Sequence, residues 1–217
     1  MILYIIRHAD PDYANNTITE FGWEEAHALA DWLKDVKIDR IYASPLGRAL
    51  DTAAPTCKEK GLEPTILPWT AESMDYMESH RFTPECNCSY SFDLQHGVHN
   101  FKDHYEENRM ATVENMIKSS DEFLASCGYS REGAFYRITE HNHDSIAVFC
   151  HGGFGCAWIA HLLNTAPGVM YPGISLNTSS VTTFEFRNSD TGFTRPVLKR
   201  LGEIDHIRRA GLRINNR

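Results

Sequence analysis

The stretch ILYIIRH, residues 2–8, decides the fold that we expect of this chain. Five consecutive apolar residues that favour β-structure are typical of a strand buried on both faces inside a parallel sheet. Arg7 and His8 follow directly beyond the carboxyl end of this strand, which is where open α/β sheets bind their ligands. The start of the chain therefore predicts both a buried sheet and a site at its edge.

The same pattern recurs in the second half of the chain. The apolar run SIAVFC, residues 145–150, ends at His151, which is followed by Gly152 and Gly153. The carboxyl ends of parallel strands meet at one sheet edge, so we expect His8 and His151 to share one site. Gly152 is placed at a helix N-terminus, where free backbone N–H groups favour an anion.

The composition is that of an ordinary soluble protein. Its 217 residues are 42% hydrophobic and 23% charged, which is sufficient for a single domain over residues 1–217. The formal net charge of −8 argues against nucleic acid and anionic membrane as partners. No stretch approaches the roughly 18 apolar residues of a membrane span, and no leader precedes the first strand. We therefore expect a cytoplasmic protein whose six cysteines are reduced thiols.

Helix and strand patterns alternate along most of the chain. Apolar residues at helical spacing predict helices at about 19–33, 47–59, 105–124 and 152–163. Short apolar runs predict strands at 2–6, 39–43, 63–67, 145–150, 180–186 and 197–201, and a hairpin at about 135–138. This alternation indicates an α/β fold, a three-layer α/β/α sandwich with a mainly parallel central sheet.

Two segments do not follow the alternation. Residues 69–103 have no sustained period, and we interpret them as a covering insertion, the first part of a substrate-side cap that reaches about residue 143. The basic tail, residues 207–217, is expected to fray.

Four residues that suit a tetrahedral dianion follow strand ends or begin helices: Arg7, His8, Arg48 and His151. An arginine donates two parallel hydrogen bonds to phosphate oxygens and keeps its charge. A neutral imidazole can attack phosphorus and divide a difficult displacement into two steps through a phosphohistidine. The second histidine and the arginines would stabilise charge on the transferring group.

Three blocks of the sequence, in this order, resemble the signatures of one family. They are Arg7-His8-Ala9, Ser44-Pro45-x-x-Arg48-Ala49-x-x-Thr52 and His151-Gly152. The blocks resemble those of the histidine phosphatase superfamily, and more narrowly its phosphoglycerate-mutase-like branch (branch 1). The resemblance implies a phosphoglycerate-mutase-like fold, with His8 as the phosphorylated nucleophile and Arg7, Arg48 and His151 in the phosphate pocket.

The resemblance also implies two further roles. An acidic residue soon after the third strand protonates the leaving oxygen, and Glu72 is the best match by position, with Asp75 and Glu78 as alternatives. An asparagine in the loop after the nucleophile contacts phosphate in many members, and Asn15 and Asn16 are near that place, with Asn15 taken as the candidate. Ala9 stands where the family most often has glycine.

These residues predict a metal-independent phosphatase that hydrolyses small phosphomonoesters through a phosphohistidine, needs no cofactor and releases inorganic phosphate. Two alternatives stay open: a cofactor-dependent phosphoglycerate-type phosphomutase, and a non-catalytic module that binds phospho-ligands. The remaining histidines near one another lack a fitting ligand set, so no metal is expected. These histidines are His96, His99 and His104, and separately His141 and His143. The substrate and the oligomeric state are open.

Overall fold

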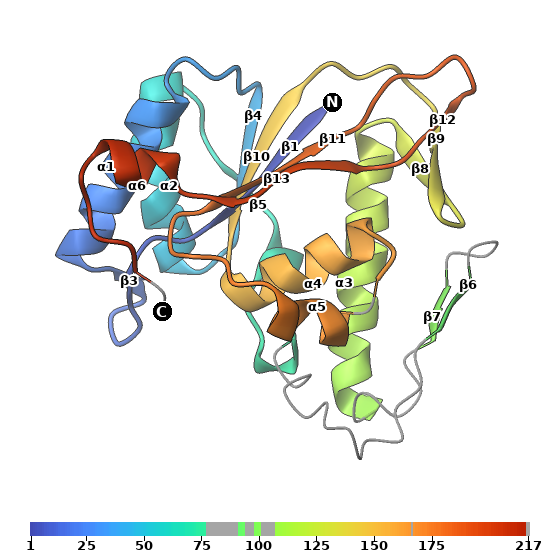
Figure 1. Cartoon of the computed structure of the whole chain (residues 1–217), viewed down its shortest axis with the longest axis horizontal. Coiled ribbons are helices and arrows are strands. Elements are labelled where there is room, and N and C mark those ends of the chain that lie inside the picture. The colour runs from blue at the N-terminus through green and yellow to red at the C-terminus, as the bar shows by residue number, and fades with distance from the viewer. Residues whose placement is uncertain (77–90, 94–97, 101–106, 166, 216–217) are drawn as a thin grey trace.

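The structure, a computed structural model, describes residues 1–76, 91–93, 98–100, 107–165 and 167–215 (Figure 1). A six-stranded sheet with the strand order β13-β11-β1-β10-β4-β5 forms its centre. These strands are β1 (Ile2–Arg7), β4 (Arg40–Ala43), β5 (Thr65–Ile66), β10 (Ser145–Cys150), β11 (Val181–Glu185) and β13 (Val197–Glu203).

The half of the sheet that carries the histidines is parallel. Strand β1 pairs in parallel with β10, β10 with β4, and β4 with β5. The last two strands, β11 and β13, pair antiparallel to their neighbours and complete the other half. The prediction of an α/β fold with a mainly parallel central sheet is confirmed.

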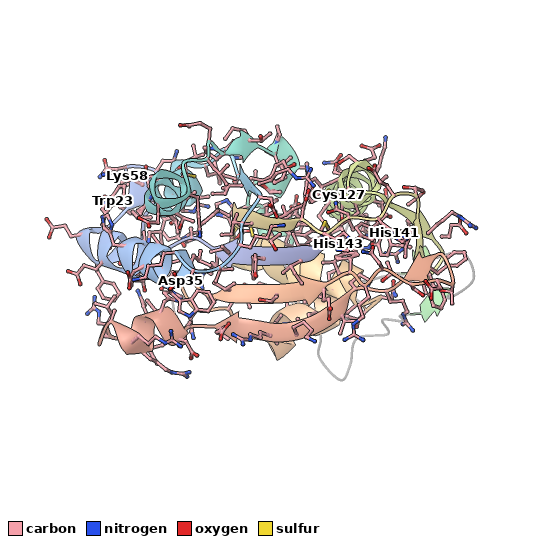
Figure 2. All side chains as sticks on the ribbon, turned by 90° about the horizontal axis from the view of Figure 1, so that it is seen from above. Trp23, Asp35, Lys58, Cys127, His141 and His143 are labelled. Atoms are coloured by element: carbon pink, nitrogen blue, oxygen red, sulfur yellow. The ribbon has the colours of Figure 1, made fainter. Side chains whose placement is uncertain are left out.

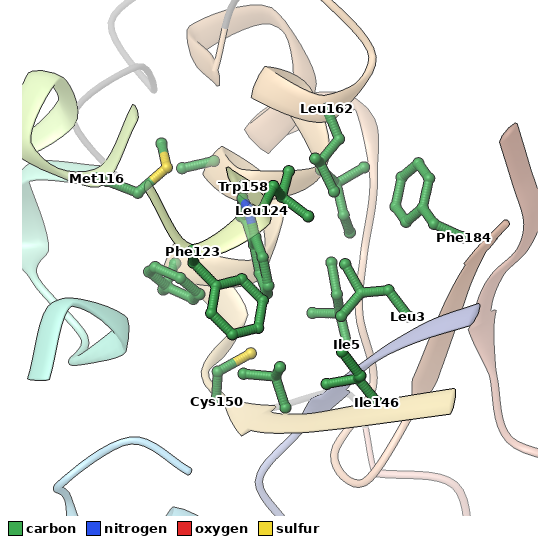
Figure 3. Packing of buried hydrophobic residues seen from close by; sticks show 14 of the residues in the cluster. Leu3, Ile5, Met116, Phe123, Leu124, Ile146, Cys150, Trp158, Leu162 and Phe184 are labelled. Carbon is green, nitrogen blue, oxygen red and sulfur yellow. The ribbon is translucent and has the colours of Figure 1, made fainter. Parts of the chain in front are cut away.

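Alternate residues of the central strands face opposite layers. Ile5 packs in a cluster with Trp158, and Figure 3 shows the two side chains on the same side of the sheet. The next residue, Ile6, packs in a second cluster with Leu29. Strand β10, buried at all six positions, alternates in the same way. Burial on both faces is the property that the apolar runs predicted.

Six helices flank the sheet in the described part of the chain (Figure 1). Helices α1 (Glu20–Leu33) and α2 (Gly47–Lys60) cover one face, and α3 (Glu107–Ser126) and α4 (Gly152–Leu162) cover the other. The N-cap Thr19 accepts a hydrogen bond from the Gly22 amide, and Gly61 ends α2 with a positive φ of 64°. The remaining two are α5 (Pro167–Gly173) and α6 (Asp205–Arg209).

Short elements complete the architecture. They are β2 (Pro11–Asp12), β3 (Thr17–Ile18), the 3₁₀ turn η1 (Pro68–Thr70), β6 (Ser91–Asp93), β7 (Val98–Asn100), β8 (Tyr129–Glu132), β9 (Phe135–Ile138) and β12 (Phe193–Thr194). Strands β8 and β9 form the expected hairpin, and β12 extends it. Residues 77–90, 94–97 and 101–106 of the proposed cap lie outside the described residues. Helix α3, in the second half of that cap, belongs to the core.

The prediction of a frayed tail is wrong for residues 207–215. Ile207 is buried in α6, which packs against α1. The neighbouring His206 ring is also buried and lies 2.8 Å from the Ser179 hydroxyl through Nε2. Further along, Asn215 donates a hydrogen bond of 2.5 Å to Asp10. The basic composition of the tail gave no indication of these contacts, because they are made by Ile207 and Asn215, which are uncharged.

No helix among the described residues is both long and apolar enough to cross a membrane. Four of the six cysteines lie in this part of the structure, and all four are buried free thiols: Cys57, Cys127, Cys150 and Cys156.

The packing of α1 on the sheet predicts a large effect of truncating Leu29, which is fully buried. Leu29→Ala is expected to lower the free energy of unfolding by about 2–5 kcal/mol, because it leaves a cavity in the core. Urea unfolding measures this loss. The matched change Leu201→Ala, at a position 44% exposed on β13, is expected to stay within about 0.5 kcal/mol. Equal losses of unfolding free energy in the two variants would contradict the burial of Leu29 between α1 and the sheet.

Candidate active site

Three parallel strands deliver side chains to one edge of the sheet. Arg7 and His8 end β1, His151 follows β10, and Ser44 follows β4. In the register, Arg7 is paired with Cys150 and Ala43 with Phe149, so the three strands stop at the same level. The rings of His8 and His151 consequently lie with their centroids 5.2 Å apart.

The ring of His8 is held in one orientation by its own loop. Its Nδ1 lies 2.7 Å from the Ala9 carbonyl oxygen, which can only accept, so Nδ1 carries the hydrogen. Nε2 is therefore the atom with the free lone pair, and His8 lines the pocket. Burial lowers the pKa of His8 to about 3, and Arg7 and Arg48 add to the decrease. The imidazole is neutral at pH 7 and competent as a nucleophile.

His151 is fully buried beside His8 and is not itself among the residues that line the pocket. Its Nε2 lies 2.7 Å from the Ser44 hydroxyl, and this hydroxyl also accepts the Leu46 amide at 3.4 Å. With the Ser44 hydrogen donated to Nε2, the ring hydrogen is on Nδ1. Nδ1 is buried and has no hydrogen-bond partner among the described residues. Burial lowers the pKa of His151 to about 2, assisted by the neighbouring His8 and the arginines.

Two guanidinium groups flank the histidines. Arg7 donates to the Leu176 carbonyl through Nη1, and Arg48, in the first turn of α2, lies with its Cζ 5.3 Å from the centre of the Tyr13 ring. The Nε atoms of both arginines are buried without a hydrogen-bond partner in the part of the chain that the structure describes. Burial lowers the pKa of Arg48, although a guanidinium stays charged in any protein environment.

Glu72 lies at the N-terminus of α4, just beyond η1. Its Oε2 accepts the Gly153 amide at 2.9 Å and its Oε1 accepts the Phe154 amide at 2.8 Å. Burial raises the pKa of Glu72, while these two N–H groups and the arginines oppose the increase. The carboxyl group is thus in the pocket and is biased toward its protonated form.

The other two acid candidates are not in this position. Asp75 accepts a hydrogen bond of 2.5 Å from the Thr112 hydroxyl and does not line the described pocket. Glu78 lies outside the described residues.

The predicted phosphate contact Asn15 does not lie in the pocket. Asn15 is exposed on the turn between β2 and β3, where its amide donates to Asp12 at 2.7 Å, and it does not line the pocket. This closed turn is the physical reason, since the Asp12 carboxylate already holds the amide. Tyr13, from the same turn, lines the pocket instead.

Gly152 does line the pocket, but the amides of the next two residues bind Glu72 rather than facing a free anion site. What the glycine provides is space. A Cβ at this position would lie 3.2 Å from Nε of Arg7, which is tighter than an ordinary van der Waals contact. The absence of a side chain lets the arginine lie against the start of α4.

The pocket encloses about 550 Å³, and one of its walls was not foreseen. Residues 171, 172, 174 and 176, at the end of α5 and just after it, form this largely apolar wall: Tyr171, Pro172, Ile174 and Leu176. Ser175 of the same segment also lines the pocket. The segment contains no charged residue and follows no strand of the predicted sheet, so the sequence offered no signal for it.

No group of three or more potential metal ligands occurs among the described residues. His141 and His143 precede β10 at its amino end, and Figure 2 shows them at the end of the molecule away from α1 and α2. The candidate site lies beyond the opposite, carboxyl end of the same strand. The side chains of His96, His99 and His104 lie outside the described part.

The fold and the site define a class of protein: a phosphoryl-transfer enzyme with a neutral histidine between two arginines at a sheet edge. The chain belongs to the histidine phosphatase superfamily (branch 1), whose family model matches residues 3–198. The expected family is thereby confirmed, and with it the enzyme class of phosphoric monoester hydrolase. A search of curated proteins found no match.

Solved structures share the fold at low sequence identity. Phosphoserine phosphatase from Entamoeba histolytica is 20% identical, with a TM-score of 0.64 over 95% of this chain and 98% of that chain. A mycobacterial glucosyl-3-phosphoglycerate phosphatase is 18% identical, with a TM-score of 0.62 over 93% and 98%. The alpha-ribazole phosphatase from Shigella flexneri is 20% identical, with a TM-score of 0.56 over 92% and 96%.

The lowered pKa values of the two histidines predict acid sensitivity of folding. In the unfolded chain they protonate near pH 6.5, but in the folded chain only at about pH 3 and 2. The unfolded chain therefore binds more protons as the pH falls below about 6.5, and the free energy of unfolding decreases from there toward about pH 3. Urea unfolding at pH 7.5, 6, 5 and 4 measures this slope.

The double variant His8→Asn, His151→Asn is expected to flatten the slope. His141→Asn, at the other end of β10, serves as the matched control and should keep the wild-type slope. The same slope in the double variant and the wild type would mean that other groups cause the acid sensitivity.

Proposed function

We propose that this chain is a metal-independent phosphatase that hydrolyses small phosphomonoesters through a phosphohistidine on Nε2 of His8. One observation carries the proposal. Three buried polar atoms at the site have no hydrogen-bond partner among the described residues: Nε of Arg7, Nε of Arg48 and Nδ1 of His151. The two arginine atoms are donors, Nδ1 of His151 is a donor when the Ser44 hydroxyl donates to its Nε2, and buried donors are nearly always paired. A phosphoryl group supplies acceptor oxygens for each of them.

In the first step, the lone pair on Nε2 of His8 attacks phosphorus, and the bond from phosphorus to the alcohol oxygen breaks. The alcohol oxygen takes the proton of Glu72 as it leaves, so no free alkoxide forms. Arg7, Arg48 and the Nδ1–H of His151 stabilise the charge on the three equatorial oxygens. The products of this step are the alcohol and phosphohistidine.

In the second step, the carboxylate of Glu72 removes a proton from water, whose oxygen attacks phosphorus. The bond from phosphorus to Nε2 breaks, inorganic phosphate leaves, and the histidine and the protonated acid are regenerated. The two arginines supply the positive charge that a divalent metal supplies in other phosphatases, which supports metal independence.

A phosphomutase would hold a substrate with two acidic groups. In the described lining of the pocket, Arg7 and Arg48 are the only cationic side chains, and the proposed mechanism uses both to hold the transferring phosphoryl group. Because no further cation of the described lining is left for a second acidic group, the pocket favours hydrolysis of a monophosphate over phosphoryl transfer within a bisphosphate.

His8→Ala is expected to abolish phosphate release, because it removes the attacking atom. Wild type and variant are assayed side by side on a panel of phosphomonoesters with EDTA present, and His141→Ala is the control that keeps activity. Rapidly base-quenched wild-type samples, kept alkaline because phosphohistidine is labile in acid, should contain phosphohistidine at residue 8 by mass spectrometry. Release by His8→Ala, or loss of wild-type release in EDTA, would contradict the proposal.

Glu72→Gln is expected to slow turnover of alkyl phosphates by about 10²- to 10⁴-fold, because no proton reaches the alkoxide. The loss should be smaller for p-nitrophenyl phosphate, whose leaving group needs no proton. With wild type, kcat/KM on an alkyl phosphate should fall as the pH rises through the raised pKa of Glu72. Asp75→Asn is the matched control, and an equal loss there would move the acid role away from Glu72.

A further inference from the structure

We propose that the preferred substrates are phosphate esters of uncharged, apolar alcohols, with the apolar group bound against Tyr171, Ile174 and Leu176. This inference rests on the proposed phosphatase function and narrows its substrate class. Three independent features of the pocket carry it: a fixed apolar wall, an apolar rim, and the absence of a spare cation in the described lining.

The apolar wall is fixed directly beside the phosphate position. Leu176 is only 6% exposed, and its carbonyl oxygen accepts a hydrogen bond from Arg7. The same residue therefore ties the wall to a group that holds the phosphoryl oxygens. Tyr171 and Ile174 are partly buried and pack against the core cluster that includes Trp158. Helix α5 lies against α4, as Figure 1 shows, so the wall is backed by the core.

The rim of the pocket is also apolar. Met74 is 72% exposed and Tyr13 is 66% exposed, and these are the two most exposed large hydrophobic side chains in the described structure. Both line this pocket. Single exposed hydrophobic residues are common, but two at the mouth of one pocket are typical of a surface that a ligand covers.

The charges available in the pocket are already assigned. Arg7, Arg48 and Glu72 line the pocket; in the proposed mechanism the two arginines hold the phosphoryl group and Glu72 protonates the leaving oxygen. A carboxylate or a second phosphate on the alcohol would lose water without gaining a cationic partner from the described lining, which is costly. An alkyl or aryl group at the same place would instead remove Met74 and the wall from water. The described part of the lining therefore favours apolar alcohols over the charged alcohols of substrates such as phosphoserine and 3-phosphoglycerate.

A series of straight-chain alkyl phosphates, from ethyl to hexyl, tests this selection. Their alcohols differ little in acidity, so the chemical step is constant while the apolar area grows. We expect kcat/KM to rise about two- to fourfold for each added methylene that contacts the wall, and phosphoserine to fall below butyl phosphate. A flat series, or a preference for phosphoserine over hexyl phosphate, would overturn the inference while the phosphatase function stands.

One variant of the wall and one of the rim test where the apolar group binds. Ile174→Ser and Met74→Ser are expected to reduce the increment per methylene, because each removes apolar contact area. Phe135→Ser, which removes an apolar side chain 44% exposed on strand β9 and outside the pocket lining, should keep the wild-type increment. If both Ile174→Ser and Met74→Ser left the increment in kcat/KM per methylene unchanged, the apolar group would bind elsewhere, which would contradict its assignment to this wall and rim.

Binding of alkylphosphonates separates this inference from the proposed catalysis. These compounds keep a dianionic head and an alkyl chain but have no ester bond to hydrolyse. Calorimetric titration of the wild-type protein should give Kd values that decrease from ethyl- to hexylphosphonate by a similar factor per methylene. This trend without any turnover would support the substrate class and refute the phosphatase function. Equal Kd values would refute the substrate class whatever the turnover.

Discussion

The site depends on two positive charges, those of Arg7 and Arg48, which line the pocket and form no ion pair with a carboxylate among the described residues. Arg7 is held by the Leu176 carbonyl, and Arg48 lies over the Tyr13 ring. Their charges, added to burial, keep both histidines neutral well below pH 7. Such an arrangement is unfavourable in the empty protein and becomes favourable when a dianion enters. The fold must therefore hold these groups in place before any ligand binds.

The backbone around His8 meets this requirement through continuous hydrogen bonding. The His8 amide donates to Cys150 of β10 at 2.9 Å, and its carbonyl accepts the Ser179 amide at 3.0 Å. The next amide, of Ala9, donates to the Thr52 hydroxyl at 2.9 Å. The following amide, of Asp10, donates at 2.7 Å to Glu25, a carboxylate that is itself buried. The backbone amides of residues 8–10 are thus all hydrogen-bonded. The backbone that carries the His8 ring is therefore held in a fixed position relative to the sheet.

Much of this was predictable, because local signals coincide with the sheet topology. The buried runs that end at Arg7 and Cys150 placed both histidines at one edge, and the N-cap Thr19 and the positive-φ Gly61 set the limits of α1 and α2. These signals act over a few residues, so they are readable from the sequence. The family blocks add the order in which the site residues occur.

The parts that were not predictable depend on contacts between distant segments. The wall that includes Tyr171 has no charged residue, and its role follows only from its place in the pocket that Arg7 also lines. Asn15 had the right neighbourhood in sequence, but a local bond to Asp12 turns it away. Residues 205–215 look like a basic tail, yet Ile207 is buried and Asn215 bonds to Asp10. In each case the deciding partner is a side chain or layer whose position no local pattern encodes.

The N-terminus of α4 illustrates how the fold can use a predicted feature for a different purpose. Its free N–H groups indicated an anion site, and they do bind an anion, but that anion is the Glu72 carboxylate. The two amides stabilise the ionised form, whereas burial favours the protonated form and is the larger effect on the pKa. A phosphoryl dianion entering beside Glu72 adds negative charge and raises that pKa further. In the proposed mechanism, Glu72 is therefore most strongly protonated when the ester is bound, and the two amides bind its carboxylate again once the proton has left with the alcohol.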